Sequence, residues 1–503
     1  MGAAASKSAP QPTVVKTEAL EEKHAVGAAP VLAKPESPDG SIALSSVAGW
    51  EEGIAASPKA QLARTIFAQS DIRTLTKRDT KVGDPHVFNL ELEFKTNPIT
   101  NQKSSGRCWL FATTNVLRYD VMKKLNLKEF QLSQACASLT HAQNYLFFWD
   151  KLNKSNYYLE LSIQESERPL DDRLINHLAG DLISDGGQWD MVVNLLETYG
   201  VVPQPIYPES LHSSLSGPLN KLLKTRLREH ALILRDLAAA LRSANAPKAQ
   251  TLATLRSKKE ELMGEIYTVM SATLGVPPMP DAKFTWDYYD KDGKAHTWEG
   301  TPKQFYKDFA LSQKYPVADS FSLIHDPRNT PSTLYTVDKL GNIWGGRPVL
   351  YVNTKINDLK DAVVKSLKAG LPVFFGCDVG QSSETPSGIM DIALFDYENT
   401  FDIQLTLSKA DRLRTNESAM THAMVISGVH LDAVGKPVRY KVENSWGETA
   451  GEKGFMVMTD AWFEQFVYQV VVPKSLAPKE LVQVFESGKK VVLPPWDPMG
   501  SLA

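Results

Sequence analysis

The stretch that decides the fold of this chain is Asn101-Gln102-Lys103-Ser104-Ser105-Gly106-Arg107-Cys108-Trp109-Leu110-Phe111-Ala112. It places a glutamine six residues before a cysteine, with Ser-Gly between them, and an apolar, helix-compatible run follows directly. This pattern predicts a thiol on the first turn of a buried helix, where the positive end of the helix dipole stabilises a thiolate. The Cys108 backbone N–H and the Gln102 side-chain amide are two candidate donors to an oxyanion. One short loop therefore predicts both a nucleophile and its oxyanion hole.

A thiolate nucleophile needs a base, and the base needs a group that orients it. Two strand-like segments far downstream, 421–430 and 438–447, supply both, and a turn by composition separates them. If the segments pair as an antiparallel hairpin, His422 and Asn444 come to lie opposite one another to within a residue, with Cβ atoms roughly 5 Å apart. The Asn444 amide oxygen would then accept from one imidazole nitrogen and leave the other facing the thiol. Trp446 is placed to shield that bond from water.

These motifs, Gln-(x)5-Cys-Trp, then His-Ala, then Asn-Ser-Trp-Gly, resemble those of the papain superfamily of cysteine peptidases. The stretch from Asn101 to Ala112 is more specifically similar to the bleomycin hydrolase branch, whose members are self-compartmentalising intracellular aminopeptidases. The similarity extends from about Trp50 to the last residue and includes, in order, Leu132–Gln134, Tyr145–Lys151, Gly186–Trp189 and Trp496–Ala503. The interval from cysteine to histidine is 314 residues here. In papain it is roughly 130–150, so about 170 residues are inserted.

The resemblance implies an α+β chain with a papain-like two-lobe fold: a helical lobe and a β-barrel-like lobe, with a large, mainly helical insertion and a C-terminal arm. It implies Cys108, His422, Asn444 and Gln102 as the catalytic set, with no metal and no cofactor. It further implies that Gly186 and Gly187 line the cleft and pair their backbone groups with the substrate.

The resemblance also implies hydrolysis of peptides with free N-termini through an acyl-enzyme, with homocysteine thiolactone or similar small molecules as further substrates. The C-terminal arm is expected to lie in its own active-site cleft, with the α-carboxylate of Ala503 where the substrate's amino group must sit. A homohexamer with active sites facing an internal chamber is the expected assembly.

Five segments are expected along the chain. The first 45 residues are rich in Ala, Pro, Ser and Lys and lack aromatic residues, which is typical of a disordered tail. The other four are an N-terminal segment and helical catalytic lobe at 46–204, a mainly helical insertion at 205–345, a β lobe with the histidine and asparagine at 346–472, and the C-terminal arm at 473–503.

Composition excludes several other classes of protein. A net charge of −3 argues against a dedicated nucleic-acid binder. Three cysteines, Cys108, Cys136 and Cys377, without a CxxC pair give neither a disulfide framework nor a zinc site, and they fit a reducing cytoplasm. The chain has no apolar run near the roughly 20 residues that span a bilayer. Its N-terminus lacks the apolar core of a signal peptide.

Several features have a plainer interpretation. Cys136 and Cys377 are expected to be core thiols, and Tyr288–Glu299, which half-resembles a calcium loop, is expected to be a hairpin turn. The segment Lys221–Glu261 carries ten Lys/Arg against four Asp/Glu, which predicts a solvated helical face rather than a weak polyanion site. Gly2 matches a myristoylation pattern, but a single acyl chain gives only weak membrane contact.

Two rival functions stay open at this point. The first is a catalytically silent scaffold or a nucleic-acid-binding relative that keeps the fold, and the intact set of Gln102, Cys108, His422 and Asn444 argues against it. The second is an endopeptidase of cathepsin type, which the missing signal peptide and the missing paired cysteines disfavour.

Overall fold

The computed structural model describes residues 39–78, 86–93, 98–132, 144–312 and 314–502. These fall into two compact units, of which the first comprises the chain up to Gln69 together with Pro327–Asn329. Its two helices, α1 (Leu44–Ala56) and α2 (Pro58–Phe67), are separated at Ser57, whose hydroxyl accepts from the Ala60 N–H at 3.3 Å. Serine at the N-cap and proline at the first helical position favour a new helix start here.

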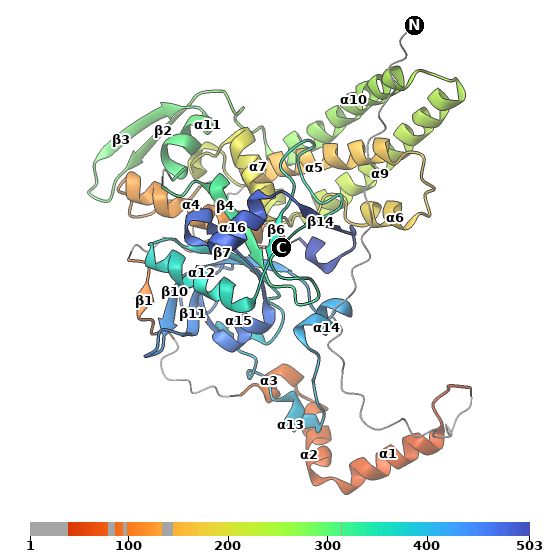
Figure 1. The fold of residues 1–503 in the computed structure, drawn as a ribbon, viewed down its shortest axis with the longest axis vertical. Coiled ribbons are helices and arrows are strands. Elements are labelled where there is room, and N and C mark those ends of the chain that lie inside the picture. The colour runs from red at the N-terminus through yellow and green to blue at the C-terminus, as the bar shows by residue number, and fades with distance from the viewer. Residues whose placement is uncertain (1–38, 79–85, 94–97, 133–143, 313, 503) are drawn as a thin grey trace. The chain divides into compact units, whose positions relative to one another are not determined.

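The second unit, which contains the rest of the described chain, has a central sheet with helices on both of its sides (Figure 1). Its helices are α3 (Ile72–Thr76), α4 (Cys108–Lys124), α5 (Asn144–Gln164), α6 (Arg173–Gly180), α7 (Trp189–Tyr199), α8 (Leu211–Ser214), α9 (Gly217–Ser243), α10 (Lys248–Leu274), α11 (Pro302–Phe305), α12 (Ile356–Lys368), α13 (Tyr397–Phe401), α14 (Lys409–Arg414), α15 (Asp460–Phe466) and α16 (Lys479–Glu486). No helix among the described residues is long and apolar enough to cross a membrane.

The strands form one large mixed sheet and one separate hairpin. They are β1 (Leu90–Glu91), β2 (Phe284–Tyr289), β3 (Ala295–Gly300), β4 (Ser320–Ile324), β5 (Thr333–Val337), β6 (Tyr351–Asn353), β7 (Val373–Cys377), β8 (Ser383–Glu384), β9 (Ile389–Met390), β10 (His422–Leu431), β11 (Pro437–Glu443), β12 (Phe455–Thr459), β13 (Val467–Pro473) and β14 (Lys490–Leu493). The large sheet runs in the order β14-β5-β6-β4-β13-β7-β10-β11-β12-β9-β8, with β1 on β10. Within the described residues this is an open path, so backbone hydrogen bonds do not close the expected barrel-like lobe.

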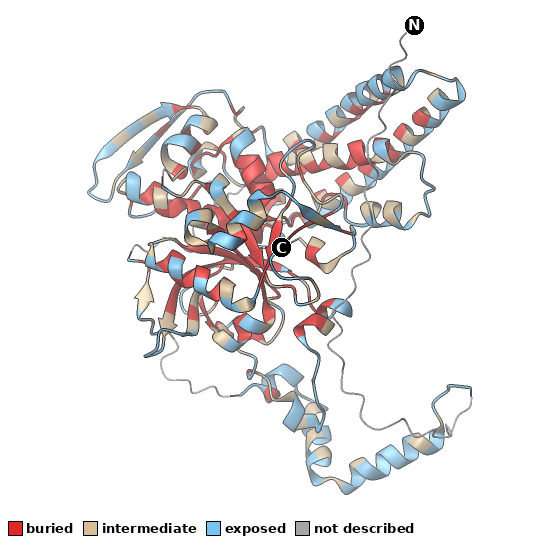
Figure 2. Ribbon diagram, viewed as in Figure 1, coloured by how far each residue is buried: buried red, intermediate tan, exposed pale blue. Residues whose placement is uncertain are grey.

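The sheet separates two hydrophobic cores, and alternation along its strands decides which side chain enters which core. In β7, Phe374 packs with the core that contains α4, α5 and α7, whereas Val373 and Phe375 pack with the core that contains α12 and α15. Successive side chains of a strand point to opposite faces, so a strand buried on both faces is apolar throughout. The central strands are accordingly buried along their length (Figure 2).

The expected insertion at 205–345 has its long helices only in its first half, and the described residues of its second half add just the short α11 and the turn that follows it. In the first half, α9 and α10 form an antiparallel pair over α5, as the helix-forming composition predicts. The second half contains β4 and β5, which belong to the central sheet because β4 pairs with β13 and β6. Between these halves, β2 and β3 pair with Tyr288 opposite His296, which confirms a hairpin in place of a calcium loop.

The expected arm at 473–503 begins as regular secondary structure. The chain first forms α16, and β14 then adds to the sheet in parallel with β5. Only from Pro494 does it leave the sheet as an irregular segment, which ends in the described structure at Leu502. Of the described residues before α4, only the two residues of β1 form a strand.

Candidate active site

Cys108 is the first residue of α4 and is almost completely buried, with 3% of its surface exposed. The loop before it is held by Gln102, whose side-chain Nε2 donates to the Ser105 carbonyl at 2.7 Å and whose Oε1 accepts from the Ser445 hydroxyl at 2.7 Å. The Gln102 backbone N–H also donates to the Ser445 carbonyl at 2.8 Å. An amide nitrogen carries two hydrogens. One of them therefore remains available after the bond to Ser105.

His422 begins β10, and its Nε2 lies 2.9 Å from the Asn444 Oδ1. The Nδ1 atom is therefore the nitrogen left for another partner. The Trp446 ring lies over this pair, with its centroid 4.9 Å from that of the imidazole. Both His422 and Asn444 are buried, so the hydrogen bond is kept from water as expected.

The pairing of β10 and β11 differs from the expected pairing by two residues. Val425 pairs with Glu443, the last residue of β11, so this register would set Asn444 opposite Met424 and not opposite His422. Because side chains alternate with a period of two, a shift of two residues keeps the histidine and asparagine on the same face. The pairing of β10 with β11 shifts by one residue between Ile426 and Gly428, and this shift puts His422 and Asn444 on the same face. No pattern in the sequence predicted the shift.

Helix α4 is fixed against the strand that leads to Asn444. Arg118 of α4 forms a fully buried ion pair with Glu443, the residue before Asn444. Helix α4, which begins at Cys108, and the end of β11 are thus joined by a charge-assisted bond.

A cavity of about 270 Å³ brings the separated segments together. Its lining includes Gln102, Cys108, His422, Gly186 and Leu502. The backbone N–H of Ala423, next to the histidine, also contacts the thiol and lowers its pKa. A thiol, an imidazole and a free amide hydrogen thus share one small cavity, an arrangement suited to acyl transfer through a thioester.

Comparisons with known proteins agree with this geometry. The model of the Peptidase C1-like family matches residues 41–500. This chain belongs to that family. It is 42% identical over 471 residues to "Cysteine proteinase 1, mitochondrial" of Saccharomyces cerevisiae, covering 92% of this chain and 93% of the relative. Identity is 40% to "Aminopeptidase C" of Streptococcus thermophilus (86% and 92% covered) and 40% to "Bleomycin hydrolase" of Rattus norvegicus (91% and 98% covered).

A solved structure is similar over the same range. The crystal structure of PepW from Lactobacillus rhamnosis superimposes with a TM-score of 0.85 at 40% identity, covering 92% of this chain and all of PepW. The mixed α and β fold is therefore shared with PepW, and the family match identifies this protein as a papain-like cysteine peptidase.

Two glycines of this C1-like peptidase border the cavity for different reasons. A Cβ atom on Gly187 would lie 2.5 Å from the Trp109 ring, so only glycine allows that ring to pack beneath the backbone. Gly186 lines the cavity itself. Its carbonyl already accepts from the Lys154 Nζ at 2.6 Å, and its N–H donates to the Ser184 hydroxyl at 3.2 Å.

The last residues of the chain reach the cavity. The Gln188 side chain donates to the Ser501 carbonyl at 2.7 Å, the Ser501 hydroxyl donates to the Met420 carbonyl at 3.0 Å, and Leu502 lines the cavity beside Cys108. Further back, the Arg173 guanidinium lies 3.8 Å from the centroid of the Trp496 ring. The expected position of Ala503 falls outside the described residues.

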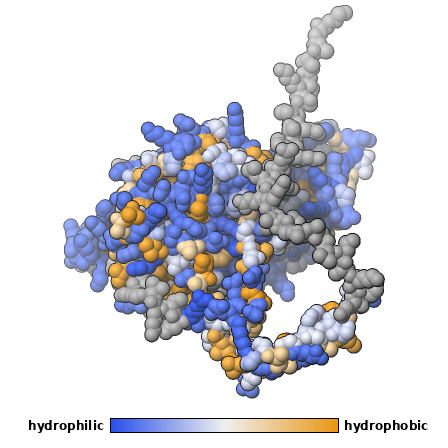
Figure 3. All heavy atoms as spheres, turned by 60° about the horizontal axis from the view of Figure 1, so that its bottom comes forward, coloured by the Kyte–Doolittle hydropathy of each residue, from blue (hydrophilic) through white to orange (hydrophobic). Residues whose placement is uncertain are grey.

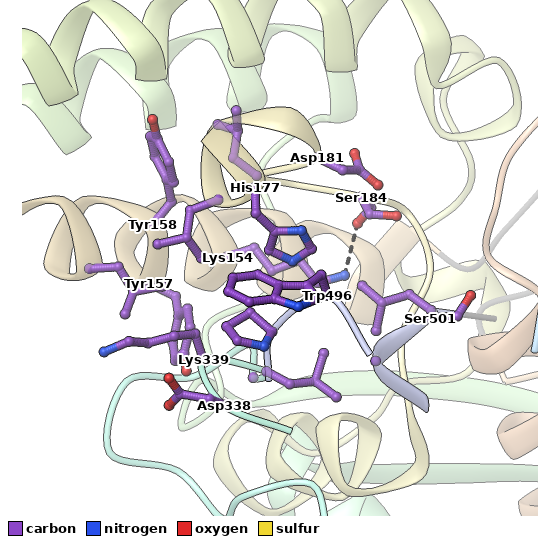
Figure 4. Close-up of a pocket in the computed structure, with 18 of the residues that line it drawn as sticks. Lys154, Tyr157, Tyr158, His177, Asp181, Ser184, Asp338, Lys339, Trp496 and Ser501 are labelled. Carbon is purple, nitrogen blue, oxygen red and sulfur yellow. Dashed lines mark hydrogen bonds between the residues drawn. The ribbon is translucent and has the colours of Figure 1, made fainter. Parts of the chain in front are cut away.

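A larger cavity of about 520 Å³ adjoins the segment around Trp496 and Ser501 (Figure 4). Figure 4 shows the Trp496 ring beneath the His177 imidazole, with Ser501 further along the same segment. The larger cavity shares Asp181, Ser184 and Leu502 with the cavity of Cys108. The C-terminal segment therefore borders both spaces.

Sequence reasoning missed the buried charges behind this site. Asp185 lines the cavity of Cys108 and forms an ion pair with Lys151 at 2.5 Å. Lys154 donates to the carbonyls of Ser184 and Gly186, at 2.8 and 2.6 Å. The sequence did contain a signal for this buried charge pair. Asp185 stands directly before a glycine pair, and Lys151 and Lys154 lie three residues apart upstream. The expectation that Cys377 is a core thiol is confirmed, whereas Cys136 lies outside the described residues.

Burial has opposite effects on the pKa values of the thiol and the imidazole. It raises the pKa of Cys108 to about 11, and nearby backbone N–H groups offset this only in part. It lowers the pKa of His422 to about 4 against the opposing effect of the Asn444 bond. In the substrate-free cavity, desolvation therefore outweighs the stabilisation of a thiolate that the start of α4 was expected to provide.

These shifts predict how activity depends on pH. Only unprotonated His422 accepts the thiol proton, so activity is expected to persist below pH 6 and to fall as the pH drops through about 4. The measurement is kcat/KM for a single-residue amide from about pH 3.5 to 7. The apparent pKa of the acidic side of this profile belongs to the cysteine–histidine pair as a unit. An acidic limb centred near 6.5, the ordinary value for histidine, would contradict this.

Proposed function

We propose that this protein is a cysteine aminopeptidase whose catalytic residues are Cys108, His422, Asn444 and Gln102. The observation that carries the proposal is that Cys108 and His422 line one cavity, with the His422 Nε2 bonded to Asn444 Oδ1 at 2.9 Å. The order of these groups, nucleophile, base and orienting amide, is what covalent catalysis of acyl transfer requires.

The first half of the reaction forms a thioester. Cys108 gives its proton to the His422 Nδ1 as its sulfur bonds to the carbonyl carbon of the substrate amide. The Cys108 N–H and the second hydrogen of Gln102 Nε2 stabilise the resulting oxyanion. The carbon–nitrogen bond then breaks, and His422 returns the proton to the departing amine.

The second half releases the acid. His422 takes a proton from a water molecule whose oxygen bonds to the thioester carbonyl. The carbon–sulfur bond breaks, and the sulfur regains a proton from the imidazolium. Throughout, Asn444 keeps the imidazole in one orientation, and Trp446 covers that bond from solvent.

The restriction to free N-termini is attributed to the C-terminal arm. Leu502 lines the cavity and Ser501 is bonded to Gln188 and Met420. In the proposal, the α-carboxylate of Ala503 lies just beyond and attracts the substrate ammonium by a charge-assisted hydrogen bond. We assign Gly187 a backbone contact with the substrate. The N–H and the carbonyl of Gly186 are already bonded, so Gly186 is assigned only to the wall of the cleft. The two-lobe interpretation of the fold belongs to the same proposal.

Hydrolysis of paired substrates tests the proposed function. Aminoacyl fluorogenic amides are expected to be cleaved with kcat/KM at least about 100-fold above that of their N-acetylated forms, because acetylation removes the ammonium and adds bulk where the arm lies. Equal rates on the two forms would refute an aminopeptidase while leaving a cysteine peptidase. Homocysteine thiolactone belongs in the same panel as a candidate small substrate.

The assembly and the location are also proposed. We propose a homohexamer, to be tested by sedimentation. The first unit supports a surface of association because large apolar side chains of α1 and α2 are exposed (Figure 3), namely Val47, Trp50, Leu62 and Ile66. A cytoplasmic location is proposed as well, although one relative is named mitochondrial, and cell fractionation distinguishes the two.

Two further interactions have weaker support. The basic face of α9 and α10 has several of its cations in ion pairs, among them Arg226 with Glu265 and Arg256 with Glu160, which favours a solvated face over nucleic-acid binding. Gly2, the candidate for myristoylation and weak membrane contact, lies outside the described residues.

A further inference from the structure

Asp185, between α6 and α7, is a buried carboxylate with four donors. Its Oδ1 accepts from the Lys151 Nζ at 2.5 Å and from the Asn220 Nδ2 at 2.8 Å. Its Oδ2 accepts from the Ser216 hydroxyl at 2.5 Å and from the Gly106 backbone N–H at 3.1 Å. Only 8% of its surface is exposed, and that part lines the cavity of Cys108. The proposed mechanism gives this charge no role.

The contacts of Asp185 hold the nucleophile's turn from both sides. Gly106, two residues before Cys108, donates to the carboxylate, and the indole Nε1 of Trp109, one residue after it, donates to the Asp185 carbonyl at 2.7 Å. The approach to Gly106 is close, since a Cβ atom there would lie 3.0 Å from the Asp185 Cβ. The turn that aims the Cys108 N–H is therefore bonded to one residue on both flanks.

The remaining donors belong to other elements. Lys151 belongs to α5. Asn220 lies in the first turn of α9, and Ser216 is the residue directly before that helix. Burial opposes ionisation of Asp185, but Lys151 and the hydrogen bonds outweigh it and hold the pKa of this carboxyl well below its usual range. All four partners are donors, so the site is matched to a carboxylate with two accepting oxygens.

We propose that Asp185 is a positioning residue of the oxyanion hole: it accepts the Gly106 N–H, fixes the turn that presents the Cys108 N–H, and ties that turn to the start of α9. This inference rests on the proposed function, because it assigns the oxyanion to the Cys108 N–H. An asparagine at the position has the same shape but one accepting oxygen, and in either orientation its NH2 group meets a group that can only donate, the Lys151 ammonium or the Gly106 N–H. The turn would then lose its anchor while the thiol stays in place.

Two reactions of the same cysteine separate positioning from general damage. Amide hydrolysis needs the oxyanion hole, whereas alkylation by iodoacetamide does not, because sulfur displaces iodide from a saturated carbon and no oxyanion forms. Asp185→Asn is expected to lower kcat/KM for amide hydrolysis about 100-fold, the effect of losing an oxyanion donor. The alkylation rate of Cys108 at pH 7 is expected to equal or exceed that of the wild type, since a nearby negative charge is removed.

A parallel fall of both rates, or no fall of hydrolysis, would overturn the proposal. Glu160→Gln is the matched control, because Glu160 is an equally buried acid that accepts from Lys259 at 2.7 Å and does not line the cavity of Cys108. Glu160→Gln is expected to lower the melting temperature without lowering amide hydrolysis relative to Cys108 alkylation. If Glu160→Gln lowered hydrolysis but not alkylation, that result would also count against the role of Asp185.

If Asp185→Asn does not fold, the double variant Ser216→Ala/Asn220→Ala decides the question. It keeps the carboxylate and its bond to Gly106 but removes both donors at the start of α9. Hydrolysis is expected to fall about 5-fold while the alkylation rate stays unchanged. A 5-fold change corresponds to about 1 kcal/mol, the net contribution of one hydrogen bond. Unchanged hydrolysis or a parallel loss would refute the proposal. Failure of the proposed function is distinguished by a wild type in which Cys108 is not alkylated at all.

Discussion

Cys108→Ser is expected to lower amide hydrolysis by at least about 10⁴-fold and to leave the fold intact, because the variant keeps the size of the side chain but loses the nucleophile. His422→Ala is expected to be about as severe, and the double variant no worse than either single one, since nucleophile and base act as one unit. The measurements are kcat/KM on a free aminoacyl amide and circular dichroism of each variant.

Alkylation provides the control for this result. Iodoacetamide at neutral pH is expected to label Cys108 in the wild type and nothing comparable in Cys108→Ser. Cys377 is the internal comparison, because it is fully buried and does not line the cavity that Cys108 shares with the proposed base His422. Cys377→Ala is expected to keep activity within a few-fold. Persistent hydrolysis by Cys108→Ser, or labelling centred on Cys377, would remove Cys108 from the mechanism.

Deleting residues 500–503 is expected to change specificity more than rate. Without Ser501 and Leu502 the arm loses its bonds to Gln188 and Met420 and no longer fills the cavity beside Cys108. Cleavage of N-acetylated and internal peptide bonds should rise at least about 10-fold, while KM for free aminoacyl amides rises because the carboxylate that binds their ammonium is gone. The ratio of kcat/KM for matched free and acetylated amides measures the change.

Leu502→Ala is the matched control for the truncation. It shortens one side chain but keeps the length of the chain and the terminal carboxylate, so the preference for free N-termini should survive. A loss of preference equal to that of the deletion would assign specificity to the leucine contact. Equal discrimination by truncated and full-length enzymes would show that the arm does not set specificity.

The sequence predicted the nucleophile and its surroundings because those features are local. A cysteine at the start of an apolar helical run, with glutamine six residues earlier, specifies a turn and a helix start, and the structure has Cys108 as the first residue of α4. The pairing of His422 with Asn444 also followed from one hairpin, because alternation along strands tolerates an error of two residues.

Longer-range features could not be predicted in this way. The strands β4 and β5 lie in a segment expected to be helical and join the central sheet through partners more than a hundred residues away, such as β13. Composition of the segment carried no information on those partners. The segment expected to be a C-terminal arm also contributes β14 to the sheet, because β5 offers an edge on which β14 pairs.

The sequence by itself specified the groups that the proposed mechanism uses: a thiol at a helix start, an imidazole with an amide to orient it, and a glutamine before the thiol. Only the tertiary structure decided their electrostatic state, because burial raises the pKa of Cys108 and lowers that of His422, and burial is a property of the packed chain. Only the tertiary structure, likewise, gathered the donors of Asp185, since Gly106 and Ser216 lie 79 and 31 residues from it along the chain. Local patterns specify dihedral angles and faces, whereas desolvation and convergent hydrogen bonds arise only when distant segments pack together.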